Sequence, residues 1–94
     1  FYIQPSITPS AVSAATTAAQ TFSVPGLQTT DIVCVLGYNG SQTAGIIIAE
    51  ADCLTNNVLS IQFGNVTALS ATPAAGVYTV QVTRLEGPAP TNAA

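Results

Sequence analysis

Apolar and polar residues alternate along much of this chain with the two-residue period of a half-buried β-strand. The clearest alternation runs through 58–63 and 76–84. The inward positions of these two predicted strands are Leu59, Ile61, Phe63, Tyr78, Val80 and Val82. Because alternate side chains of a strand point to opposite faces, each segment is expected to present one face to a core and the other to solvent.

Turn-forming residues separate further short apolar runs. Strands are predicted from about 13 to 24, over 31–36 and over 45–54, with Pro25–Gly26 and Asn56–Asn57 as turns. Strands at this spacing predict an all-β fold, a small antiparallel β-sandwich of the jelly-roll or immunoglobulin-like kind. The expected organisation is an extended N-terminal arm over 1–10, one sandwich domain over 11–86 and a flexible tail over 87–94.

The run 31–36 is apolar on both faces. Its positions alternate between Ile32, Cys34 and Leu36 on one face and Val33 and Val35 on the other. A continuous β-branched run predicts a strand that is covered on both sides. Since one face of an antiparallel sheet is usually solvated, the face of Val33 and Val35 is expected to meet a neighbouring subunit.

The first nine residues contain two prolines and several large apolar side chains. Proline fixes φ and removes a hydrogen-bond donor, so Phe1–Pro9 is expected to be extended rather than helical. We expect Phe1, Tyr2, Ile3 and Ile7 to dock on a neighbouring copy or on another protein, because an exposed apolar arm is a liability for a monomer. A frayed terminus is the alternative.

The composition strengthens the expectation of covered surfaces. Apolar residues make up 48% of the 94 positions, but charged residues make up only 5%. The charged side chains are Asp31, Glu50, Asp52, Arg84 and Glu86. A net charge of -3 without lysine argues against nucleic-acid binding, which needs cationic contacts to phosphate. The longest apolar run, 46–49, is too short to cross a membrane, which takes about 20 residues.

Candidate catalytic residues are scarce. The chain has no histidine or lysine, so no acid–base constellation, metal cluster or cofactor site can be assembled, and an enzyme is not expected. Cys34 and Cys53 lie in apolar runs, where free thiols behave as small buried hydrophobes; a disulfide between them stays open.

The charged residues favour structural roles. Glu50 and Asp52 would share one face of a strand and could bind a hard cation, although a solvated face is the favoured interpretation. Asp31 is expected to cap a turn after Thr29–Thr30. Arg84 is expected to form a terminal ion pair with Glu86.

Several words of the sequence are similar to those of small proteins encoded near the structural genes of tailed bacteriophages. They are 18–27 (AAQTFSVPGL), 29–33 (TTDIV), 58–65 (VLSIQFGN) and 72–80 (TPAAGVYTV). The similarity extends over about 7–85 and includes no catalytic motif. The family resembles virion surface components, namely head decoration (cement) proteins, short head fibres and related appendages.

The resemblance implies a capsid decoration protein that binds and stabilises the outer surface of a phage head. The implied partners are further copies of the chain, as a homotrimer, and the major capsid protein. The implied location is the virion, assembled in the host cytoplasm. The residues expected at partner interfaces are Phe1, Tyr2, Ile3, Ile7, Val33, Val35 and Tyr38. The alternative is a tail or head-fibre module that binds host glycans through the loop 38–41, where Tyr38 could stack on a sugar.

Overall fold

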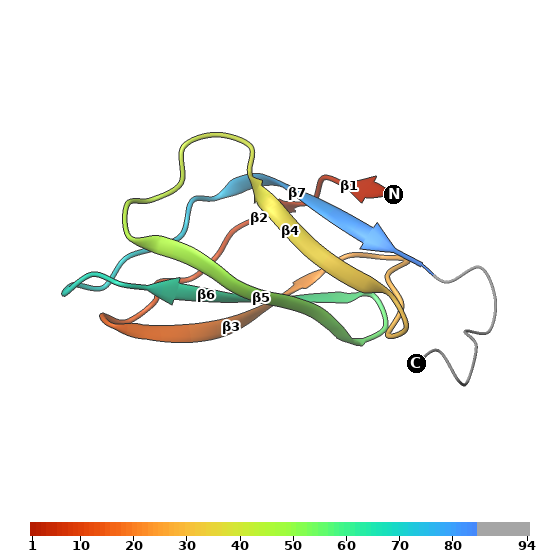
Figure 1. Cartoon of the computed structure of the whole chain (residues 1–94), viewed down its shortest axis with the longest axis horizontal. Helices are drawn as coiled ribbons and strands as arrows, with labels where there is room; N and C mark the ends of the chain where they lie inside the picture. The colour runs from red at the N-terminus through yellow and green to blue at the C-terminus, as the bar shows by residue number, and fades with distance from the viewer. Residues whose placement is uncertain (85–94) are drawn as a thin grey trace, which may run out of the picture.

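The chain folds as two antiparallel sheets that face each other (Figure 1). The computed structural model describes residues 1–84. Its strands are β1 (Tyr2–Ile3), β2 (Ser6–Ile7), β3 (Thr16–Ser23), β4 (Ile32–Tyr38), β5 (Ile46–Thr55), β6 (Val58–Asn65) and β7 (Gly76–Thr83). One sheet contains β7 between β4 and the β1–β2 pair, and the other has the order β3–β6–β5. The prediction of a small all-β sandwich is confirmed.

The two middle strands supply most of the core, as their alternation predicts. In β6, Leu59, Ile61 and Phe63 have no exposed surface, and the inward residues of β7 are equally buried. The rings of Phe63 and Tyr78 meet edge to face across the sandwich, with 6.1 Å between their centroids. Hydrophobic burial between β6 and β7 therefore holds the two layers together.

The N-terminal segment forms short edge strands of the domain's own sheet. Both β1 and β2 pair with β7, and the backbone N–H of Tyr78 donates to the carbonyl of Pro5 at 3.0 Å. Ile7 is buried in the core and Ile3 packs against it. The expected arm that docks elsewhere is therefore not confirmed, because the free edge of β7 takes up this segment.

Strand β4 corrects the prediction about its two faces. Val33 is buried and Val35 packs against the core, whereas Ile32 and Leu36 are more than half exposed. A shift in the β4–β7 register between Val35 and Gly37 marks a bulge. The side of β4 with Val33 and Val35, which was expected to meet a neighbouring subunit, therefore faces the core of the domain itself.

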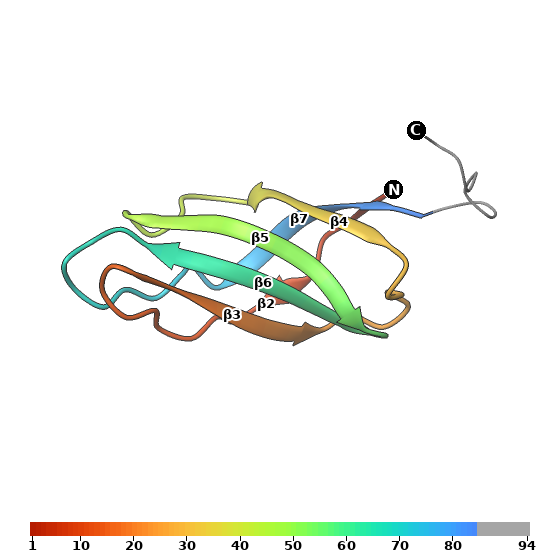
Figure 2. The same cartoon turned by 60° about the horizontal axis from the view of Figure 1, so that its bottom comes forward.

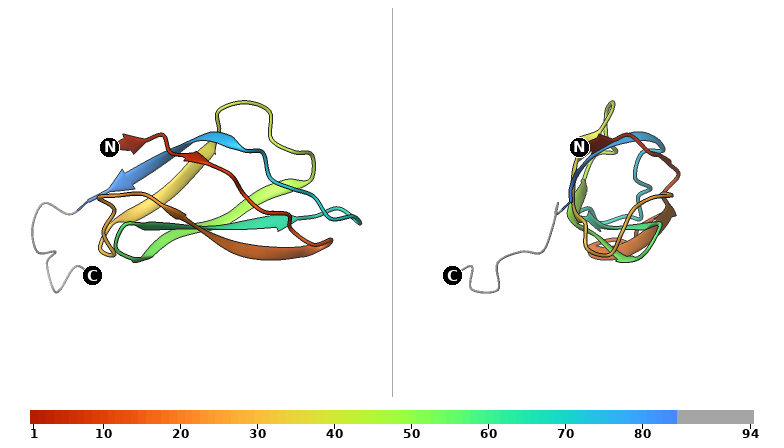
Figure 3. Two further views of the ribbon diagram at one scale, coloured as in Figure 1. Left: turned by 180° about the vertical axis from the view of Figure 1, so that it is seen from behind. Right: turned by 90° about the vertical axis from the view of Figure 1, so that its right-hand side faces the viewer.

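The second edge of β4 lies beside β5, so the two sheets approach each other along this side (Figure 2). Seen end-on, the strands enclose the core almost like a barrel (Figure 3, right). The predicted tail, 87–94, and residues 85 and 86 lie outside the described residues.

Two of the predicted turns are joined by hydrogen bonds. Gly26 has φ 95°, which suits the third position of the Pro25–Gly26 turn, and Asn57 has φ 69° in the hairpin between β5 and β6. The Asn57 side-chain oxygen accepts a hydrogen bond from the backbone N–H of Gly26 at 2.8 Å, and the backbone N–H of Asn57 donates to the carbonyl of Leu27 at 2.7 Å. These bonds connect the end of β3 to the β5–β6 hairpin.

Candidate functional site

The outer face of the β1–β7–β4 sheet is uncharged. Residues paired across an antiparallel ladder point to the same side, and Gln81 pairs with Tyr2 on one side and with Cys34 on the other. The outward side chains of this face are Tyr2, Gln4, Ile32, Cys34, Leu36, Thr79, Gln81 and Thr83. We call this surface the uncharged face. It combines an apolar stripe on β4 with hydroxyl and amide groups on β7.

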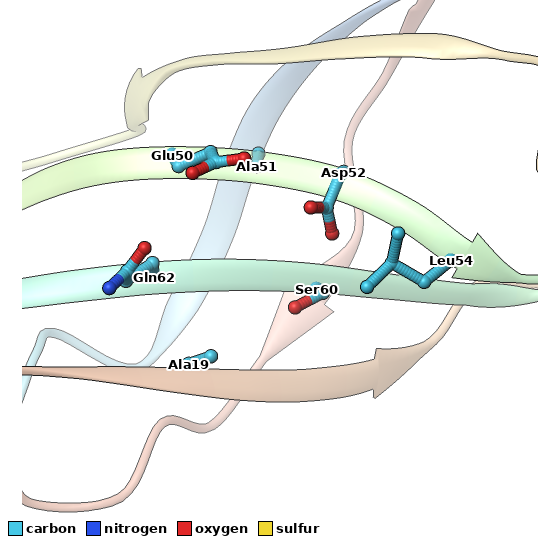
Figure 4. A pocket seen from close by; sticks show the side chains of 7 residues that line it. All are labelled: Ala19, Glu50, Ala51, Asp52, Leu54, Ser60 and Gln62. Carbon is cyan, nitrogen blue, oxygen red and sulfur yellow. The ribbon is translucent and has the colours of Figure 1, made fainter.

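The outer face of the β3–β6–β5 sheet contains two carboxylates. Glu50 pairs with Gln62 and Asp52 pairs with Ser60, so the prediction that Glu50 and Asp52 share a face is confirmed. With Ala19, Ala51 and Leu54 they line a shallow hollow of about 120 Å³ (Figure 4). We call this surface the carboxylate face.

The carboxylate face does not have the composition of a metal site. Figure 4 shows the Asp52 carboxylate directed toward β6, and its Oδ1 is buried without a hydrogen-bond partner within residues 1–84. The Gln62 amide nitrogen donates to the hydroxyl of Thr17 at 3.0 Å. No group of three or more His, Cys, Asp or Glu side chains in the described part of the chain could hold a metal ion.

Asp31 and Arg84 form a bidentate ion pair at one end of the sandwich. Arg84 donates through Nε at 2.8 Å and through Nη2 at 2.7 Å to the buried carboxylate. The Asp31 carboxylate also accepts from the backbone N–H of Gln28 at 2.9 Å, so the predicted turn cap is present. The pKa of Asp31 is lowered from 3.8 to about 2, and the hydrogen bonds from Arg84 are the largest cause. Burial of the carboxylate raises the pKa and is the second largest effect, and the hydrogen bond from Gln28 lowers it further.

This pair has a structural role. Arg84 also donates to the carbonyl of Gly26 at 2.9 Å, and its guanidinium lies 5.4 Å from the centroid of the Phe1 ring. It therefore ties the end of β7 to the turn after β3 and to the N-terminal residue. Glu86, the predicted partner of Arg84, lies outside the described residues.

Tyr38 is not a free aromatic on a loop. Its ring packs against Tyr78 with 5.1 Å between centroids, and its hydroxyl donates to the carbonyl of Ala75 at 3.0 Å. The adjacent residues Asn39, Gly40 and Ser41 are exposed. The loop therefore has no aromatic platform of the kind that a glycan site would use.

The residues expected at a partner interface fall into three groups. Ile7 and Val33 are buried in the domain's own core, which removes them from any interface. Ile3, Val35 and Tyr38 are partly buried against the same core. Phe1 and Tyr2 are 61% and 64% exposed and keep the ability to contact a partner.

Sequence reasoning missed the outward residues of β4. Ile32 and Leu36 are 63% and 56% exposed, and Cys34 between them is exposed as well. The expectation that both thiols are buried is correct for Cys53 and wrong for Cys34. Both thiols are free, and the Cys53 thiol contacts the carbonyl of Thr55 at 3.1 Å. The sequence of this strand is apolar on both of its faces, so it does not indicate which of the two faces is outward.

The comparisons with known proteins add no relative. No family model, curated protein or solved structure matches this chain. No helix in the described part of the chain is long and apolar enough to cross a membrane. The functional argument therefore depends on the surfaces of the domain.

Proposed function

We propose that this protein is a structural component of a bacteriophage virion, a capsid decoration protein that binds the outer surface of the head as a homotrimer and stabilises it. The phage origin depends on the sequence resemblance. The structural role is supported by the surface of the domain, which carries many large apolar side chains and very few charges.

The exposed apolar side chains are the observation that carries the proposal. The large hydrophobic residues that are at least half exposed are Phe1, Tyr2, Ile32, Leu36, Ile47, Leu54, Val66 and Leu69. Monomeric soluble proteins seldom leave so much apolar surface with so little charge around it. A protein that is held in a lattice would cover this surface with its neighbours.

These residues lie on more than one side of the domain. Tyr2, Ile32 and Leu36 belong to the uncharged face, whereas Ile47 and Val66 line a hollow of about 340 Å³ beside β3 and β6. Two separate surfaces suit a protein that contacts both its own copies and the shell beneath it. Binding to the assembled shell, but not to free subunits, would stabilise the shell by mass action.

The glycan-binding alternative has no specific support in the geometry. Its loop, 38–41, turns its one aromatic ring into the domain through the contact of Tyr38 with Tyr78. An enzymatic function has no support either, since the one arginine in the described residues is paired with Asp31 and the carboxylates of Glu50 and Asp52 have no basic neighbour.

The test is binding to heads of the phage that encodes the chain. Purified protein is mixed with heads that lack it, and the heads are pelleted through sucrose. We expect saturable co-sedimentation and a higher temperature of head disruption. Protein that stays in the supernatant at every concentration would refute decoration of the head. Light scattering of the protein alone should give three times the 9.5 kDa chain mass.

A further inference from the structure

One side of β3 has no neighbouring strand. β3 is 8 residues long and pairs with β6 along its whole length without a register shift, and within residues 1–84 no strand pairs with its other side (Figure 2). We call that other side the β3 edge. Charged residues, prolines and bulges are the usual protection of such an edge, and β3 contains none of them. The edge is therefore open to pairing with a further strand.

The backbone of the β3 edge has unpaired hydrogen-bonding groups. The N–H of Val24, one pair beyond the end of the β3–β6 ladder, donates to the carbonyl of Asn57 at 2.9 Å. Because hydrogen-bonded pairs alternate along an antiparallel ladder, the N–H and C=O groups of every second residue point away from β6. These residues are Thr17, Ala19, Thr21 and Ser23, which are all exposed. Within residues 1–84 their N–H groups have no acceptor, and of their carbonyls only that of Thr17 has a donor, the Thr16 hydroxyl at 3.4 Å.

We infer that the β3 edge binds an extended segment of the shell protein, which joins the β3–β6–β5 sheet as an additional strand. The inference rests on the proposed function, because the shell is the partner proposed there and the β3 edge is the surface assigned to it. An alternating row of unpaired N–H and C=O groups matches the backbone of an extended polypeptide, which carries the same groups at the same spacing. The chemistry of the partner is thus given by the edge itself.

A hollow at the end of β3 provides a place for an anchoring side chain. It has a volume of about 230 Å³ and is lined by residues that include Phe1, Ile3, Val24 and Leu27. Val24 directly follows Ser23, the last residue of the edge. A segment that pairs with β3 and continues past Ser23 would therefore reach this hollow, where a bulky apolar side chain of the segment can be buried.

The surroundings of the edge define the side chains that the segment should have. On the core side of β3, Ala18 and Phe22 pack against the core, so apolar residues suit the positions beside them. On the outer side, Glu50 and Asp52 belong to the same sheet and have no ion pair within residues 1–84. Together with the net charge of -3, these carboxylates favour an uncharged or basic segment over an acidic one.

A second copy of this chain is a less suitable occupant. The Gln20 side chain accepts from the backbone N–H of Ser10 at 2.7 Å and donates to the Ser10 carbonyl at 2.8 Å, beside the middle of β3. Pairing of two β3 edges about their midpoint would place these groups of both copies about 5 Å apart, where the two Ser10 segments would crowd each other. Such a pairing would also be two-fold, whereas the oligomer proposed above is a trimer. A single extended segment avoids both problems.

The first experiment measures hydrogen exchange of the β3 amides by mass spectrometry with residue-level fragmentation. In the free protein, we expect fast exchange at Thr17, Ala19, Thr21 and Ser23, and slow exchange at the alternate residues, which donate to β6. After the protein has bound to phage heads, the four fast amides should become protected. The alternate amides should not change, so they serve as the internal control.

The second experiment compares two substitutions at one position. Thr21→Pro removes an N–H that points away from β6, so the β3–β6 ladder stays complete, and proline is tolerated at such edge positions. Thr21→Val removes the hydroxyl and keeps the N–H. In co-sedimentation with heads, we expect Thr21→Pro to bind at least about tenfold more weakly than the wild type, because the ring blocks the incoming strand, and Thr21→Val to bind like the wild type. Circular dichroism checks that both variants fold, and Ala19→Pro replaces Thr21→Pro if that variant does not.

The remaining outcomes separate this inference from the proposed function. Wild-type protein that pellets with heads while the four amides stay unprotected would refute strand addition and leave head decoration standing. Equal binding by Thr21→Pro and the wild type would do the same. Protection of the four amides in the free protein would show that a second copy occupies the edge, which overturns the inference. Wild-type protein that does not pellet refutes the proposed function and, with it, the shell as the partner.

Discussion

Asn65 joins three segments of the domain and provides a sharp test of the structure. It is buried at the end of β6, and its amide nitrogen donates to the carbonyls of Val12 at 3.0 Å and Leu69 at 2.9 Å. Its amide oxygen accepts from the backbone N–H of Thr67 at 2.9 Å and from the Thr67 hydroxyl at 2.6 Å. The perturbation is Asn65→Ala, which removes all four hydrogen bonds.

The size of the expected loss of stability depends on which polar groups keep a hydrogen bond after the substitution. Each hydrogen bond contributes about 1 kcal/mol net, so the four together contribute about 4 kcal/mol. After the substitution the Val12 carbonyl keeps the N–H of Ala71, and the single proton of the Thr67 hydroxyl can be donated to the Leu69 carbonyl, whereas the Thr67 N–H loses its acceptor. We therefore expect the free energy of unfolding to fall by about 3 kcal/mol, which lowers the melting temperature of a domain of this size by about 12–24 °C.

The assay is thermal and urea unfolding followed by circular dichroism, with Asn39→Ala as the control. Asn39 is exposed and its side chain makes no hydrogen bond within the described residues, so its removal should change stability by less than about 0.5 kcal/mol. A loss below about 1 kcal/mol for Asn65→Ala would refute the reasoning, because water or the loop itself would then replace these bonds.

Two further predictions concern the ion pair and the glycines. Because the pKa of Asp31 is about 2 in the folded state and 3.8 ordinarily, the ion pair stabilises the fold above about pH 4 and loses this contribution as the pH falls toward 2. The melting temperature should therefore fall between pH 6 and pH 2. Asp31→Asn, which leaves Arg84 without its carboxylate, should remove this part of the pH dependence. Gly45→Ala should lower the melting temperature more than Gly26→Ala, because both have positive φ but only the new Cβ at Gly45 would clash with Thr67, and equal losses would contradict the packing.

The sequence by itself determined the local elements of this protein. Alternation identified the two middle strands and their inward side chains, because one face of each is apolar and the other is polar. Turn chemistry identified Pro25–Gly26 and Asn56–Asn57, since few residues tolerate a positive φ. The two-residue period also placed Glu50 and Asp52 on one face. These predictions depend on neighbouring residues alone and are confirmed.

Tertiary structure decided which of two similar faces lies inside. The period of a strand determines that Ile32 and Leu36 share a face opposite Val33, but when both faces are apolar only the packing against the second sheet selects one. The same reason applies to the N-terminal segment, whose apolar residues suit a partner as well as the free edge of β7. The pairing of Asp31 with Arg84, 53 positions apart, likewise depends on β4 and β7 being neighbours. Contacts between distant segments therefore established which residues remain on the uncharged face.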